Sequence, residues 1–114
     1  AVSENGRITE GCAGIYNQNQ IEAWKRITDF IHQYTSTKIG MQLGHSGRKG
    51  ASKKPCETTF SGNSWELLSA SAVVFNENLK PEVSGPKEMT ATDMIWLFLN
   101  LFKLQKMLKK LILI

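Results

Sequence analysis

Cysteine is scarce in this chain of 114 residues, which contains only Cys12 and Cys56. The two are far apart, and neither has the neighbouring Cys or His that a zinc site requires. His32 falls within an expected helix and His45 in a glycine-rich loop, so a Cys–His nucleophilic pair is not expected either. We expect no metal site and no disulfide framework. Free thiols are typical of a reducing compartment, and we expect the chain to be cytoplasmic.

The signatures of nucleic-acid binding are also missing. The formal net charge is +4 and the isoelectric point is about 9.2. Residues 1–93 carry ten basic and ten acidic side chains, so the whole excess comes from Lys103, Lys106, Lys109 and Lys110. There is no basic stripe with interleaved aromatics and no zinc-finger or helix-turn-helix pattern. We therefore expect no nucleic-acid partner.

A long uncharged apolar run is absent, although residues 95–114 are rich in Leu, Ile and Phe. Their four lysines argue against a membrane-spanning helix. On a helical wheel the lysines gather on one side with leucines opposite, which is typical of a cationic helix lying in a membrane interface. The same narrow residue usage is expected from an A/T-rich stretch read in a shifted frame. We expect a membrane partner only if these residues are genuine protein sequence.

Two helices are predicted. Asn17 is a good N-cap, and apolar residues follow it at three- and four-residue steps as far as Tyr34. We expect Trp24 and Phe30 to lie in the core. Thr90 and Asp93 form a capping box, which predicts a second helix beginning at Ala91.

A short buried strand is predicted from Lys38 onward. Apolar residues alternate there with small or polar ones, so that Gln42 shares one face with Gly40 and Gly44. A carboxamide offers both a donor and an acceptor, which suits the edge of a flat heterocycle. The strand runs into a glycine-rich loop whose polar side chains are His45, Arg48 and Lys49.

The loops are also informative. Residues 38–54 contain no acid, so their basic side chains are suited to a phosphate or a coenzyme A tail, or are simply solvated. Glycines and prolines keep residues 50–88 irregular, with one short extended piece expected between Leu67 and Phe75. Tyr16 and Trp65 are interpreted either as lining a pocket or as packing.

The sequence QLGHSGRK at residues 42–49 resembles the third-strand signature of the old yellow enzyme family of flavin-dependent oxidoreductases. Residues 1–3, 6–9, 14–17, 68–71 and 86–90 resemble, in the right order, the segments that flank this strand. Residues 11–14 and 23–27 are most similar to the reductase half of bifunctional hydroxylases that act on aromatic coenzyme A thioesters. Departures from the pattern are Cys56, where relatives tend to carry Trp, and the pair at residues 72–73, which replaces a proline-containing step.

The resemblance implies an α/β fold, a fragment of a (β/α)8 TIM barrel with about two βα units in residues 1–94. It also implies FMN and NAD(P)H as cofactors, with hydride passing through FMN to an activated alkene or an aromatic-CoA-derived substrate. Gln42 aligns with the glutamine that hydrogen-bonds the flavin pyrimidine edge. His45 and Arg48 become candidate catalytic residues, and Lys49 a candidate for binding substrate, which includes the possibility of a CoA thioester.

A barrel needs about 250 residues, so we expect this chain to be a piece of a larger enzyme, inactive without the remainder of its barrel. Residues 95–114 lack the family pattern and are treated as an amphipathic helical tail. The alternative is a small non-enzymatic protein whose cationic tail docks on a membrane or on a partner helix.

Overall fold

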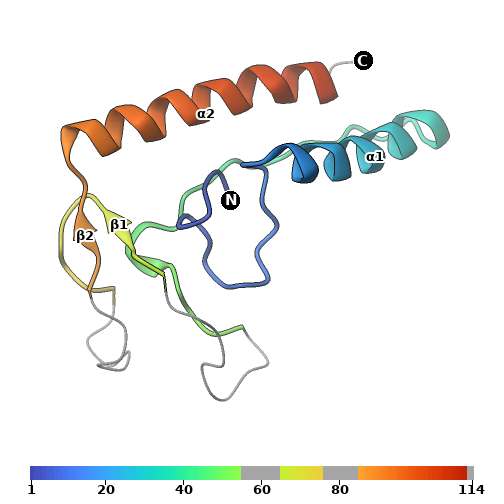
Figure 1. Ribbon diagram of the computed structural model, residues 1–114. Helices are drawn as coiled ribbons and strands as arrows, with labels where there is room; N and C mark the ends of the chain where they lie inside the picture. Colours follow the sequence, from blue (N-terminus) through green and yellow to red (C-terminus); the bar gives the residue numbers. More distant parts are fainter. Residues whose placement is uncertain (55–64, 76–84, 113–114) are drawn as a thin grey trace.

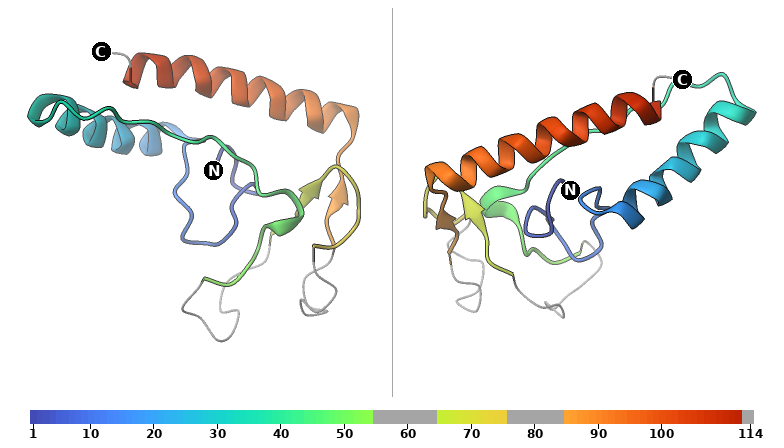
Figure 2. Two further views of the ribbon diagram at one scale, coloured as in Figure 1. Left: turned by 180° about the vertical axis from the view of Figure 1, so that it is seen from behind. Right: turned by 45° about the horizontal axis from the view of Figure 1, so that its top comes forward.

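The computed structural model describes residues 1–54, 65–75 and 85–112, and it contains two long helices and one short parallel sheet (Figure 1). The order is α1 (Gln18–Tyr34), a 3-10 turn (Gly47–Lys49), β1 (Leu68–Ser69), β2 (Lys87–Glu88) and α2 (Ala91–Ile112). The two helices run in the same general direction, and α1 lies beside the C-terminal end of α2 and extends past it, as both views of Figure 2 show. Two helices and a parallel strand pair make this an α/β arrangement, and within the described residues neither helix packs on the strands.

Helix α1 begins where its cap predicts. The Asn17 side chain accepts a hydrogen bond of 3.0 Å from the backbone N–H of Gln20. The helix packs on the hydrophobic core through Ile21 and Trp24, and Thr28, one turn further on, is also buried. Phe30 is 61% exposed, so its predicted place in the core is wrong. The helix projects past the core at its C-terminal end, where Phe30 contacts Tyr34 instead, with ring centroids 4.9 Å apart.

After α1 the chain runs back along the helix in an extended conformation (Figure 2). The predicted alternation is present, because Met41 and Leu43 are half-buried against the core and Gln42 is exposed. A strand, however, is not formed over residues 38–44. Within the described part of the chain the backbone of this segment makes one bond to a neighbour, from Val2 N–H to Gly44 C=O at 3.2 Å. A parallel ladder needs a strand alongside, and one bond does not make it.

The expected extended piece between residues 67 and 75 contains β1. It pairs in parallel with β2, in a register that places Leu68 opposite Lys87 and Ser69 opposite Glu88. Lys87 N–H donates to Leu67 C=O at 2.7 Å, and Met89 N–H donates to Ser69 C=O at 2.8 Å. The second strand was not predicted. Cys56, which departs from the family pattern, lies outside the described residues.

Helix α2 starts at Ala91, as its capping box predicts. Asp93 N–H donates to Thr90 Oγ1 at 3.2 Å, and Thr90 N–H donates to Asp93 Oδ2 at 2.9 Å. The Thr90 hydroxyl also donates to Asp93 Oδ2, at 2.7 Å, and this bond together with the one from the Thr90 N–H lowers the pKa of the Asp93 carboxyl. The helix then continues without interruption to Ile112 and turns Leu104 and Leu108 inward.

The hydrophobic core is small. Its buried members are Val2, Ile15, Leu104 and Leu108, which come from the N-terminal loop and from α2. Side chains of α1, α2 and the extended segment pack around them. The core therefore joins both helices to the start of the chain and fixes the glycine-rich loop beside residues 2–8.

Candidate functional site

The exposed face of the extended segment carries Gln42. Its side chain makes no hydrogen bond to the described part of the chain. On either side of it, a methyl group added to Gly40 or Gly44 would meet no atom within 4 Å. This face is therefore bare backbone around one carboxamide, with room for a flat ring to lie against it.

The loop that follows is held by the N-terminal residues. Ser46 N–H donates to Gly6 C=O at 3.0 Å, and Ser46 Oγ donates to Arg7 C=O at 2.9 Å. The chain then makes a tight turn through Gly47, whose φ of +56° is in the left-handed region that favours glycine. The N-terminal loop and this loop are thus joined by one backbone bond and one side-chain bond, the latter between residues 39 apart in sequence.

His45 is fixed at the start of this turn. Gly47 N–H donates to its Nδ1 at 3.0 Å, so the neutral ring carries its proton on Nε2. The ring packs closely on Gly6, where an added Cβ would lie 2.7 Å from His45 Cδ2. Burial lowers the pKa of His45. At neutral pH the ring is therefore an uncharged donor, and its Nε2–H has no partner within the described ranges.

Arg48 and Lys49 point to different parts of the chain. Arg48 Nη2 donates to Ser71 Oγ at 2.8 Å, which ties the turn to the residues after β1. Lys49 Nζ lies 5.5 Å from the centre of the Phe75 ring and is exposed. His45 thus lies just before the turn that carries Arg48 and Lys49, and the side chains of Arg48 and Lys49 diverge.

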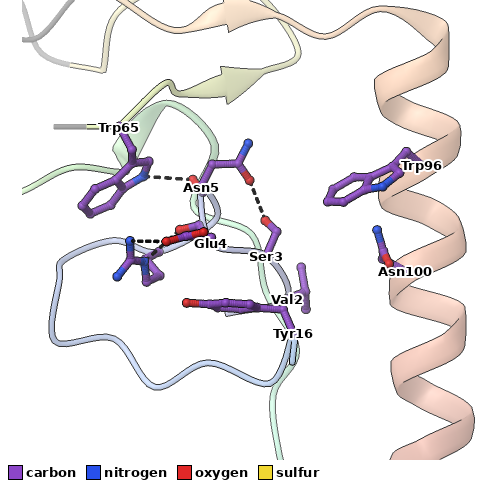
Figure 3. A pocket seen from close by; sticks show the side chains of 9 residues that line it. Val2, Ser3, Glu4, Asn5, Tyr16, Trp65, Trp96 and Asn100 are labelled. Carbon is purple, nitrogen blue, oxygen red and sulfur yellow. Dashed lines mark hydrogen bonds and ion pairs between the residues drawn. The ribbon is translucent and has the colours of Figure 1, made fainter. Parts of the chain in front are cut away.

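A hollow of about 500 Å³ lies elsewhere, between the N-terminal loop and α2 (Figure 3). Gln42 and the three loop residues do not line it. Tyr16 and Trp65, the two aromatics that the sequence singled out, both do. The full lining consists of Val2, Ser3, Glu4, Asn5, Arg7, Tyr16, Trp65, Trp96 and Asn100.

The wall of the hollow around Trp65 is built by hydrogen bonds. Trp65 Nε1 donates to Asn5 C=O at 3.1 Å, and the Arg7 guanidinium lies 4.6 Å from the centre of the Trp65 rings. Ser3 Oγ donates to Asn5 Oδ1 at 2.7 Å (Figure 3). Trp65 is therefore both a packing residue and a wall residue. Neither Arg7 nor Asn5 was singled out from the sequence as a residue of this wall.

In residues 1–54, 65–75 and 85–112, no three His, Cys, Asp or Glu side chains are placed to hold a metal ion. Neither described helix is both long enough and apolar enough to cross a bilayer.

Comparison with known proteins gives a consistent result. The sequence model of the family described as NADH:flavin oxidoreductase / NADH oxidase matches residues 1–97. An NADPH dehydrogenase of Listeria monocytogenes is 36% identical over 88 residues, which are 77% of this chain and 22% of that protein. An NADPH dehydrogenase of Clostridium acetobutylicum is 34% identical over 92 residues, which are 81% of this chain and 23% of that protein.

A fungal relative matches a shorter stretch. An NADH:flavin oxidoreductase of Gibberella zeae is 49% identical over 55 residues, which are 48% of this chain and 13% of that protein. The chain thus spans less than a quarter of the length of each of these three relatives.

Proposed function

Because the chain belongs to the NADH:flavin oxidoreductase / NADH oxidase family, we propose that it contributes the flavin-contacting third strand of an FMN-dependent NAD(P)H oxidoreductase. The names of the family and of its relatives imply FMN and NAD(P)H as cofactors. In this proposal the extended segment becomes a strand of a (β/α)8 barrel once neighbouring strands lie beside it. The enzyme is proposed to be cytoplasmic, in keeping with its scarce cysteines.

The main support for this proposal is the exposed face around Gln42. A flavin ring is flat, and its pyrimidine edge presents both donors and acceptors. Gln42 offers a carboxamide of the same dual character, unused by the described chain and flanked by two glycines that leave the space open. These residues fit the group, and Gln42 would hold its pyrimidine edge.

The loop residues have proposed roles that follow from their contacts. His45 keeps an uncharged Nε2–H donor available, and Arg48 is held by Ser71, so both are candidate active-site residues with fixed positions. Lys49 is exposed and cationic, which suits the phosphates of a CoA thioester. FMN bound beside them would supply the chemistry, passing hydride from NAD(P)H to an activated alkene or an aromatic-CoA-derived substrate.

A chimera tests the proposal. The matching 88-residue segment of the Listeria NADPH dehydrogenase would be replaced by its counterpart from this chain. We expect the purified chimera to retain FMN and to oxidise NADPH, because the flavin-contacting residues supplied by this chain would be intact. A chimera that folds, by circular dichroism and a sharp thermal transition, but retains no FMN would refute the proposal.

A further inference from the structure

The outward side of α2 is apolar where a helix on the surface of a protein is normally polar. Ile95, Phe98, Leu99 and Phe102 are between 47% and 65% exposed. Phe98 and Phe102 stack on each other, with ring centroids 6.3 Å apart. Exposed large apolar residues gathered in one place mark a surface that contacts something else.

Lysines continue the same side of the helix. At 3.6 residues per turn, Lys103, Lys106 and Lys109 fall within the half of the helix that carries these apolar residues. Lys106 Nζ lies 4.6 Å from the centre of the Phe102 ring, which shows directly that the two groups share a side. We call this surface the outer face of α2; it consists of Ile95, Phe98, Leu99, Phe102, Lys103, Lys106 and Lys109.

No acid balances these lysines on the helix. Asp93 is the only acidic residue of α2, and its carboxylate is engaged in the N-terminal cap with Thr90. The outer face is therefore cationic as well as apolar.

The leucine side of α2 is already occupied. Leu104 and Leu108 are buried in the core, and Leu97 and Leu101 pack against it. From the helical wheel alone, the leucine side would be the one that faces lipid. In the structure the leucine side is buried, and the opposite side, with its phenylalanines, is exposed.

The lysines restrict the kind of partner that can cover the outer face of α2. A dry protein interface or a sheet would have to bury three ammonium groups, which is costly unless each is paired. An anionic lipid surface accepts both parts of the face, because aromatic side chains enter the headgroup boundary while lysine ammonium groups reach the phosphates. We propose that the outer face of α2 docks on anionic membrane lipid.

Vesicle binding tests this proposal with the full chain. Co-sedimentation would be measured with vesicles of phosphatidylcholine alone and of phosphatidylcholine with phosphatidylglycerol. We expect binding only to the anionic vesicles. Replacing Lys103, Lys106 and Lys109 by Gln should weaken it on the order of 100-fold, since each lysine near such a surface contributes about a fivefold factor. Phe98→Ser with Phe102→Ser should also abolish it.

The matched control removes two exposed rings from the other helix, by Phe30→Ser with Tyr34→Ser, and should leave vesicle binding unchanged. Helicity measured by circular dichroism shows that each variant is folded. Equal binding to both kinds of vesicle, or binding that survives the lysine and phenylalanine changes, would overturn the proposal. So would competition by millimolar inorganic phosphate, which would identify a phosphate site, or a dimer that Phe98→Ser abolishes in the absence of lipid binding.

Discussion

At the scale of single residues, the loop after Gln42 shows how the chain fixes side chains without a complete sheet. Ser46 holds the loop to the backbone of Gly6 and Arg7, and Gly47 binds the His45 ring. The bond from Ser46 to Arg7 joins residues 39 apart in sequence, whereas the bond from Gly47 to His45 is local. Contacts within the chain therefore fix His45 and Arg48 in place without a bound cofactor.

His45 provides a test at this scale. Its pKa is lowered by burial, so the folded chain binds a proton less readily than the unfolded chain. The contribution of neutral His45 to the free energy of unfolding should therefore be fully present above a pH of about 6.5. It should decrease as the pH falls from there toward the pKa of the folded state. We expect the ring resonance of His45, followed by NMR, to titrate with a midpoint below 6.5.

His45→Gln is the control for that titration. In this variant the free energy of unfolding should depend less on pH below about 6.5, because the group that takes up the proton is gone. A midpoint at or above 6.5 would contradict the burial of the ring against Gly6.

Residue chemistry also shows what the sequence is able to predict. Asn17, Thr90 and Asp93 act through bonds to backbone three residues away, so their sequence spacing determines the cap, and both helix starts are confirmed. The alternation of residues 40–44 between a bare face and a half-buried face is confirmed for the same local reason. The proposed role of Gln42 stays a prediction.

At the scale of elements, what the sequence does not predict depends on distant neighbours. Residues 38–44 have the pattern of a strand, but a strand exists only when another strand binds its backbone. Phe30 has the spacing of a core residue, but the core does not extend as far as its turn of α1. The wall of the hollow joins Arg7 to Trp65 and was not visible in the sequence, because no local pattern connects two residues so far apart.

Helix α2 has two apolar sides, and the structure distinguishes them. Leu104 is 5% exposed and belongs to the core, whereas Leu99 is 58% exposed. Leu104→Ala should therefore lower the free energy of unfolding by about 2–4 kcal/mol, through lost burial and the cavity left behind. Leu99→Ala should change it by no more than about 0.5 kcal/mol. Urea unfolding followed by circular dichroism measures both, and equal losses would mean that α2 packs by a different side.

At the scale of the whole molecule, the chain is extended for its length. Its radius of gyration is 16.2 Å, whereas a compact domain of this size has one of about 13 Å. Among the described residues the main hydrophobic cluster has four buried side chains, and several large apolar residues of both helices remain exposed. In the proposed barrel, a sheet would cover α1 and strands would lie beside residues 38–44. The lysines on the outer face of α2 suit a lipid surface better than they suit a sheet.

We propose that Gln42 hydrogen-bonds the flavin, and the FMN dissociation constant of the chimera with the Listeria enzyme tests this contact. Gln42→Leu should weaken FMN binding about tenfold, because the loss of one or two hydrogen bonds costs about 1–2 kcal/mol. Gln33→Leu makes the same change at an exposed position of α1 and should leave the constant unaltered. If the chimera binds FMN equally well with Leu at position 42, then Gln42 does not hold the flavin and the account is contradicted.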